Sequence, residues 1–254
     1  MTLSCVVAPP VRVLHAARRP ALVLVAHGSR DPVAAAEVRR LAAAVRSARP
    51  ELDVRLAYLG LNGPLLPQVL DELAGPAVLV PLLLSRGYHL RVDLPAALAG
   101  APQVHGVVTP PLGPDRLLAE ALAGRLREAG WAGEPVVLAA AGSRDPAAAE
   151  DVAAQAGLLA GLLGVEVRPG YVTGSGPSVA AAVAELGEAA VAGYFTAPGD
   201  FARLAAAAGG RVTAAALGAH PGVVRVVLER YAAAVLGQSV REDCRWAKTT
   251  TLSV

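Results

Sequence analysis

Short apolar runs alternate with longer amphipathic segments along most of the chain. In the first half, four runs rich in leucine and β-branched residues end at turn residues, as buried strands do: 21–26, 53–59, 77–84 and 104–110. The segments between them repeat apolar residues every three or four positions, as in Val38, Leu41 and Val45, which is the spacing of one helix face. Strands that alternate with helices predict a doubly wound parallel sheet, an α/β fold.

The second half of the chain repeats this order. Four further runs predict strands, at 135–140, 165–172, 188–195 and 211–217. The pentapeptide GSRDP occurs at 28–32 and again at 142–146, each time directly after an apolar run. Two other pairs of segments keep the same order, YLGLNGP with YVTGSGP and PLGPD with ALGAH. We therefore expect two tandem repeats of one α/β domain, which gives a bilobal molecule.

The boundary between the repeats is placed in the connector REAGWAGEP, which has the glycines, charges and proline of a loop. A chain of 254 residues is long enough for two cores of ordinary size. We expect an N-terminal domain at 21–131 that carries the site and a degenerate C-terminal domain at 132–237. Flexible tails are expected at 1–20 and 238–254.

Composition narrows the classes of function. Hydrophobic residues make up 54% and charged residues 17%, as in a folded globular protein. No stretch approaches the roughly 20 strongly apolar residues of a membrane span, and a net charge of +2 provides no basic face for nucleic acid. Cys5 and Cys244 match no metal-binding or redox spacing. We expect a soluble, cytoplasmic protein without membrane or nucleic-acid partners, and either a monomer or a homodimer.

The two repeats differ in their histidines. His27 precedes the first GSRDP, where the second repeat has Ala141, so the turn itself does not need the imidazole. His89 follows another strand and a glycine turn, where the second repeat has Phe201. The strand ends of a parallel sheet meet at one edge, so both imidazoles should lie there. Imidazole binds divalent iron, cobalt, nickel and zinc and also accepts protons, which predicts a site that holds a metal transiently.

The segments AHGSRDP and VPLLLSRGYHLRVDLP resemble the two histidine motifs of the sirohydrochlorin and cobalt chelatases of the CbiX/SirB type, in the class II chelatase superfamily. The resemblance spans residues 21 to about 237, and the second half resembles the degenerate repeat of the long, two-domain forms. It implies an enzyme that inserts a divalent metal into the tetrapyrrole sirohydrochlorin in the cleft between the lobes, without ATP. It also implies that His27 and His89 bind the metal and remove protons, with Fe²⁺ or Co²⁺ as substrate and no tightly bound cofactor.

The substrate that the resemblance implies has a flat apolar ring edged by carboxylates. A site for it should combine apolar walls with cations. We expect Leu83 and Leu84 to contribute to the wall, and Arg30, Arg86 and Arg91 to bind the carboxylates.

Other polar residues near the motifs are expected to be structural. Asp93 is assigned to the cap of the helix at Leu94 rather than to the orientation of His89. Many family members have an acidic residue in the second strand motif where this chain has Gly60, so no third protein ligand is assigned. Phe201 is expected to matter for stability more than for chemistry. Left outside the site are Glu37, Asn62, His15, His105 and His220.

Several functions remain as alternatives at this point. The first is a chelatase that places Fe²⁺ into sirohydrochlorin to give sirohaem, and its near variant inserts cobalt for cobalamin. The second is a carrier that binds a metal or a tetrapyrrole without turnover. A phosphate-binding protein that uses the helix N-terminus after His27 ranks last, because the chain has no glycine-rich phosphate loop.

Overall fold

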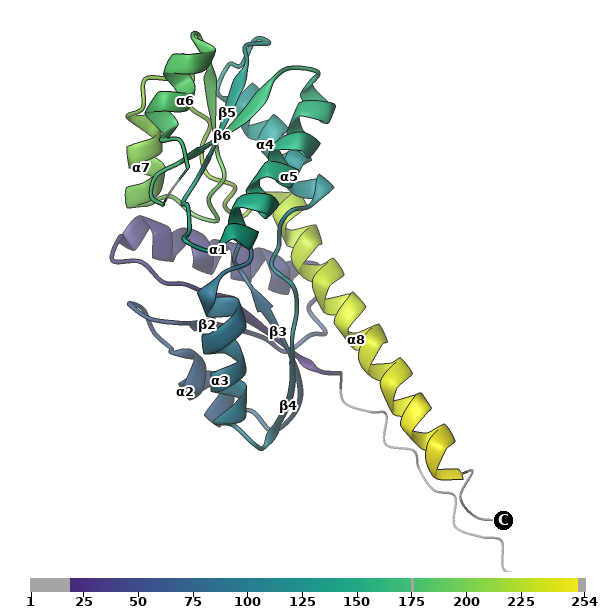
Figure 1. Cartoon of the computed structure of the whole chain (residues 1–254). Coiled ribbons are helices and arrows are strands. Elements are labelled where there is room, and N and C mark those ends of the chain that lie inside the picture. Colours follow the sequence, from purple (N-terminus) through teal and green to yellow (C-terminus); the bar gives the residue numbers. More distant parts are fainter. Residues whose placement is uncertain (1–18, 175, 251–254) are drawn as a thin grey trace, which may run out of the picture.

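The structure, a computed structural model, describes residues 19–174 and 176–250, with the backbone alone for 238–250 (Figure 1). Each half of the chain forms one parallel sheet. The first sheet has the order β2-β1-β3-β4 and the second has the order β6-β5-β7. The strands are β1 Ala21–Ala26, β2 Val54–Tyr58, β3 Gly75–Pro81, β4 Val104–Val108, β5 Val136–Ala140, β6 Val167–Tyr171 and β7 Ala190–Gly193.

Helices follow the strands and cover the sheets, which confirms the predicted α/β fold with two repeats. They are α1 Pro32–Ala48, α2 Leu66–Asp71, the π-helix η1 His89–Asp93, α3 Leu94–Ala99, α4 Arg116–Glu128, α5 Pro146–Leu163, α6 Val179–Leu186, α7 Asp200–Ala206 and α8 Pro221–Thr250. Among the described residues, no helix combines the length and the apolar character that crossing a membrane requires.

The second sheet lacks the fourth strand that the sequence predicts at 211–217. In the described chain this segment pairs with β7 through a single bridge between Val191 and Thr213. The end of the segment bonds instead to the loop after β7, where the N–H of Leu217 donates to the carbonyl oxygen of Phe195. Three consecutive alanines, 214–216, have little preference for strand geometry. The prediction of a strand here was wrong.

The ends of the chain differ from the predicted tails in one respect. Residues 1–18 of the predicted N-terminal tail lie outside the described residues. At the other end, helix α8 runs from Pro221 to Thr250, so the backbone is helical across most of the segment predicted as a patternless tail. Sequence inspection missed this because the segment has no clear apolar face.

Each half of the chain contributes its last helix to the other half. Helix α4 packs against α5 and β7 of the second half, and α8 packs against α1 and β3 of the first. Figure 1 shows α4 beside β5 and α5 in the upper lobe, and α8 running from the junction past the lower lobe. Leu118, Leu122 and Leu126 of α4 are fully buried. The two lobes therefore share one continuous core, which fixes the sheets relative to each other.

The GSRDP turn has the same construction in both halves. Gly28 and Gly142 have φ angles of 98° and 87°, and a Cβ at either position would lie within 2 Å of a backbone oxygen. Asp31 and Asp145 then cap α1 and α5, each by accepting a hydrogen bond from the N–H two residues ahead. Since only glycine tolerates that backbone conformation and that close contact, and the aspartate caps the helix, local structure explains why both residues recur in the two halves.

Candidate functional site

A cavity of about 1100 Å³ lies between the two sheets and is lined by residues of both halves. It is larger than the roughly 300–1,000 Å³ of pockets that hold drug-sized ligands. The loops that follow β1, β3, β5 and β7 all reach it, so the carboxyl ends of the two sheets face one space. This is where open α/β sheets collect their ligands.

The two predicted histidines meet in this cavity. His27 follows β1 directly, and His89 is the first residue of η1. Their ring centroids are 4.7 Å apart, with an angle of 54° between the ring planes. At this separation two ring nitrogens can contact one ion or one small group. The structure thus brings both imidazoles together at one wall of the cavity.

The protein environment favours the neutral form of His27. Burial by surrounding atoms lowers the pKa of His27 below its ordinary value, and the nearby His89 ring lowers it further, while Asp93 acts in the opposite direction. Neutral imidazole is the form that binds a metal or accepts a proton. His27 is therefore prepared for either task at neutral pH.

Asp93 orients His89, which corrects the prediction that it caps a helix. Asp93 Oδ2 lies 2.5 Å from His89 Nδ1. The backbone of Asp93 is already helical, with φ −70° and ψ −41°, and its side chain makes no cap hydrogen bond. Since η1 continues into α3, no helix begins at Asp93 and no cap is required. A carboxylate accepts, so Nδ1 carries the proton and Nε2 is the nitrogen left for a ligand.

Two of the three predicted carboxylate-binding arginines are occupied by the protein itself. The guanidinium of Arg86 contacts Asp151, with 2.9 Å between Nε and Oδ1, and Glu150 at 3.0 Å. The guanidinium of Arg91 lies 2.5 Å from Asp145. These carboxylates belong to the second half, so both arginines connect the lobes. Their charge is thus already paired within the protein, and the expectation that they bind substrate carboxylates stays a prediction.

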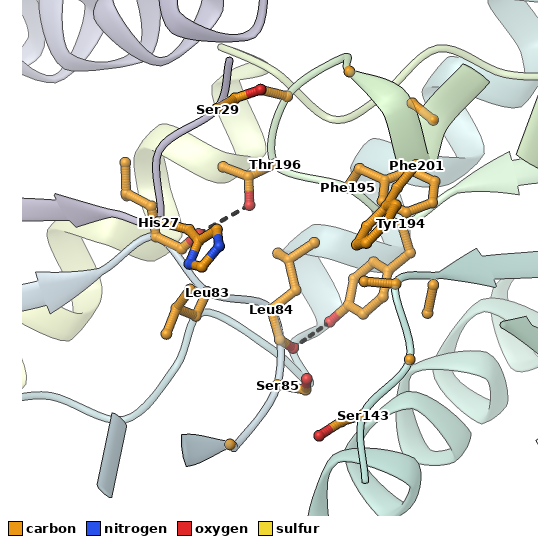
Figure 2. Close-up of a pocket in the computed structure, with 18 of the residues that line it drawn as sticks. His27, Ser29, Leu83, Leu84, Ser85, Ser143, Tyr194, Phe195, Thr196 and Phe201 are labelled. Carbon is orange, nitrogen blue, oxygen red and sulfur yellow. Dashed lines mark hydrogen bonds between the residues drawn. The ribbon is translucent and has the colours of Figure 1, made fainter. Parts of the chain in front are cut away.

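The other predicted contacts remain open to a ligand. Arg30 is exposed, lines the cavity, and has no ion-pair partner among the residues that the structure describes. Leu83 and Leu84 are half-buried and line the same space. Figure 2 shows Leu83 beside His27, and Leu84 between His27 and a group of aromatic side chains. One cation and an apolar wall are thus available to a ligand.

Within the described residues, no third metal ligand accompanies the histidines. In the described part of the chain, no group of three or more histidine, cysteine, aspartate or glutamate side chains could hold a metal ion. Asn62 lines the cavity, and its Oδ1 accepts a hydrogen bond from the N–H of Ser29; Glu37 accepts one from the N–H of Ala219. Two imidazoles are therefore the metal-binding groups that the protein offers here.

Two other histidines lie elsewhere. His105 is exposed on β4, and His220 Nδ1 accepts a hydrogen bond from the N–H of Gly222 at the start of α8. Neither lines the cavity. His15 lies outside the described residues.

The second half supplies a wall that sequence inspection missed. Tyr194, Phe195, Thr196 and Phe201 line the cavity, and Figure 2 shows the three aromatic rings gathered across from His27. Burial raises the pKa of Tyr194, whose hydroxyl donates to the carbonyl oxygen of Leu84 at 2.9 Å. The sequence contained one indication of this wall, because Phe201 occupies the position in the second repeat that His89 occupies in the first. It was not used, because an aromatic residue is more often part of a core.

A family model described as CbiX matches the chain twice, over residues 21–129 and over residues 135–234. Each match covers one half of the fold. Among curated protein sequences, none matches this chain.

Several solved structures are similar over most of their length. SirB from Bacillus subtilis, determined with Fe³⁺, is 25% identical with a TM-score of 0.69, and the alignment covers 84% of this chain and 94% of that chain. CbiX, described as the terminal enzyme for siroheme biosynthesis in denitrifying bacteria, is 28% identical with a TM-score of 0.67, covering 84% of this chain and 99% of that one. SirB from Bacillus subtilis subspecies spizizenii in complex with cobalt is 23% identical with a TM-score of 0.70, with coverages of 84% and 94%.

Proposed function

The chain belongs to the CbiX family and is a metal chelatase, and from this premise we propose that it inserts Fe²⁺ into sirohydrochlorin, with His27 and His89 as the residues that handle the metal. The observation that carries the proposal is the 4.7 Å separation of the two imidazole rings at one wall of a cavity large enough for a tetrapyrrole. Iron is the first choice because a relative with 28% identity serves siroheme biosynthesis and another with 25% identity was determined with Fe³⁺.

The reaction exchanges two protons for one metal ion. A divalent metal enters the macrocycle as two pyrrole N–H bonds break, so the products are the metallated ring and two protons. No bond in the ring skeleton changes and no electron is transferred. The protein must therefore present the metal to the ring and provide bases near the pyrrole nitrogens.

The two imidazoles meet both requirements. His27 is held in its neutral form by burial, and Asp93 holds the Nδ1 of His89, so each ring offers a nitrogen to a metal ion or a proton. With His27 and His89 as the two protein ligands, the remaining coordination positions of the ion would be left for water and the incoming pyrrole nitrogens. A two-histidine site binds more weakly than the four-ligand cage of a structural metal, which favours release of the ion into the ring.

The other residues that line the cavity would hold the macrocycle in position. Leu84 and the aromatic side chains across from it would cover the faces of the macrocycle, and Arg30 would bind one of its carboxylates. Arg86 and Arg91 would act indirectly, by holding the lobes that form the cavity. No nucleotide takes part in these steps.

Cobalt is the alternative metal. Ligand chemistry does not separate Fe²⁺, Co²⁺ and Ni²⁺ at a pair of imidazoles, because the affinity order and the preferred geometries overlap. Metal preference therefore has to be measured on this protein.

The experiment is a matrix of metals and tetrapyrroles. Sirohydrochlorin and protoporphyrin are each supplied with Fe²⁺, Co²⁺ or Ni²⁺ under anaerobic conditions, and metallation is followed by absorbance. We expect sirohydrochlorin to be metallated faster than in protein-free solution, with many turnovers per chain and no added nucleotide. A single equivalent of product would identify a carrier, and preference for protoporphyrin would contradict the proposed substrate.

A further inference from the structure

Phe201 is an exposed aromatic side chain on the wall of the cavity. It is the second residue of α7, its relative exposure is 43%, and it lines the same cavity as His27 and His89. Aromatic side chains contribute most when they are buried. A large apolar ring left open inside a cavity indicates a place where a ligand completes the burial.

Helix α7 is fixed against the loop that carries His27. A Cβ at Gly199, just before α7, would lie 3.8 Å from the Cβ of Ala34 and 3.9 Å from the Oγ of Ser29. The guanidinium of Arg203 forms an ion pair with Asp31 of the first GSRDP turn. The start of α7 therefore packs on the other half of the molecule, and the position of Phe201 relative to His27 is set by these contacts.

The aromatic wall and the histidine pair lie on different halves of the fold. His27 and His89 come from the first half, whereas Phe195 and Phe201 come from the second. Figure 2 shows the phenyl rings and His27 on opposite sides of the pocket, with Leu84 between them. A planar conjugated ring placed in this space would meet apolar groups on one side and imidazole nitrogens on the other.

We propose that Phe201 is a substrate-positioning residue that stacks on one face of the tetrapyrrole and holds it beside His27 and His89. The inference rests on the proposed function and names the contact that the second half makes with the substrate. In the first half this repeat position carries the imidazole of His89; in the second it carries a flat apolar ring. The replacement of histidine by phenylalanine at this position then has a functional explanation, because the first lobe binds the metal and the second lobe supports the tetrapyrrole.

The test measures binding of metal-free sirohydrochlorin, followed by the fluorescence of the macrocycle. Phe201→Ala should weaken binding about tenfold, equivalent to about 1.4 kcal/mol, and raise KM by a similar factor. Its kcat at saturating sirohydrochlorin should fall by less than KM rises. Phe201→Tyr, which keeps the ring, should restore binding, whereas Phe201→Leu, which keeps only the apolar bulk, should resemble the alanine variant.

Leu204→Ala is the matched control. Leu204 lies on the same helix and is 59% exposed, but it does not line the cavity, so its removal should leave binding unchanged. Co²⁺ binding without tetrapyrrole should be the same in Phe201→Ala as in the unaltered protein, which excludes damage to the histidine pair.

Three results would overturn the inference: wild-type affinity for sirohydrochlorin in Phe201→Ala, wild-type affinity in Phe201→Leu, or an equal loss of affinity in Phe201→Ala and Leu204→Ala. If the unaltered protein binds and metallates sirohydrochlorin in these cases, the proposed function stands and only the role of Phe201 fails. If the unaltered protein does not bind sirohydrochlorin, both fail.

Discussion

At the scale of single residues, the ring of His89 is held by Asp93 through a 2.5 Å contact at Nδ1. Partners of this kind fix the tautomer of a metal-binding histidine, and their removal usually costs 10- to 100-fold in metal affinity. We predict that Asp93→Ala weakens Co²⁺ binding by about this factor. Asp93→Asn keeps an oxygen acceptor, so its affinity for Co²⁺ should fall by less. Titration of the protein with Co²⁺ by visible absorption measures both variants, and unchanged affinity in Asp93→Ala would show that His89 needs no such support.

Arg30 and Arg86 both line the cavity but have different surroundings. Arg86 is paired with Asp151 of the second half, whereas Arg30 has no ion-pair partner among the described residues. We predict that Arg30→Ala raises KM for sirohydrochlorin several-fold, because a carboxylate contact is lost. Arg86→Ala should lower the midpoint of thermal unfolding and leave KM unchanged. Steady-state kinetics and thermal unfolding measure these effects. If Arg86→Ala instead raised KM and left the unfolding midpoint unchanged, Arg86 would be a substrate-binding residue.

The sequence was sufficient to predict where the two histidines lie, but not to predict the ion-pair partners of the arginines around them. His27 and His89 each follow a strand, so topology alone placed them at one edge. The partners of Arg86 and Arg91 lie 65 and 54 residues away, in the other half of the chain. Pairing across such separations depends on how the lobes pack, which no local pattern contains.

At the scale of elements, the GSRDP turn joins strand to helix in both halves with one geometry. A methyl group at Gly142 would lie 1.8 Å from the carbonyl oxygen of Thr173, and one at Gly28 would lie 1.9 Å from that of Gly60. Both glycines also have positive φ angles. We predict that Gly142→Ala and Gly28→Ala each lower the free energy of unfolding by at least about 2 kcal/mol. Denaturant unfolding is the measurement, and a loss in only one variant would mean that the two turns are not equivalent.

Element prediction succeeded where local pattern and packing agree. Residues 21–26 are all apolar and become the fully buried strand β1. It failed at 211–217, where the pattern fits a strand but β7 has only four residues to pair with. The segment instead divides its hydrogen bonds between β7 and the loop that follows it. The available partner decides whether such a segment becomes a strand.

At the scale of the whole molecule, the lobes are joined by two ion pairs that mirror each other. Arg91 of the first half contacts Asp145 of the second, and Arg203 of the second half contacts Asp31 of the first. In each case the carboxylate caps the helix after GSRDP, and the arginine comes two residues after the position of His89 or Phe201. The duplication therefore produced a matched pair of contacts between the lobes.

The exchange of α4 and α8 makes each half depend on the other. The apolar face of α4, with Leu118, Leu122 and Leu126, is buried mainly against the second half. We predict that a fragment of residues 21–131 does not fold as a monomer, because that face has no partner in the fragment. Circular dichroism with light scattering after size exclusion measures this. A stable, monomeric fragment with cooperative unfolding would contradict the shared core.

The most direct test of the account is the rate at which sirohydrochlorin is metallated with Fe²⁺ by the protein and by two histidine variants. His27→Ala and His89→Ala should each reduce the rate at least about 100-fold while their circular dichroism stays unchanged. His105→Ala removes an exposed histidine outside the cavity and should keep the wild-type rate. A near-normal rate in either His27→Ala or His89→Ala would contradict the claim that this pair of imidazoles carries the metal to the ring.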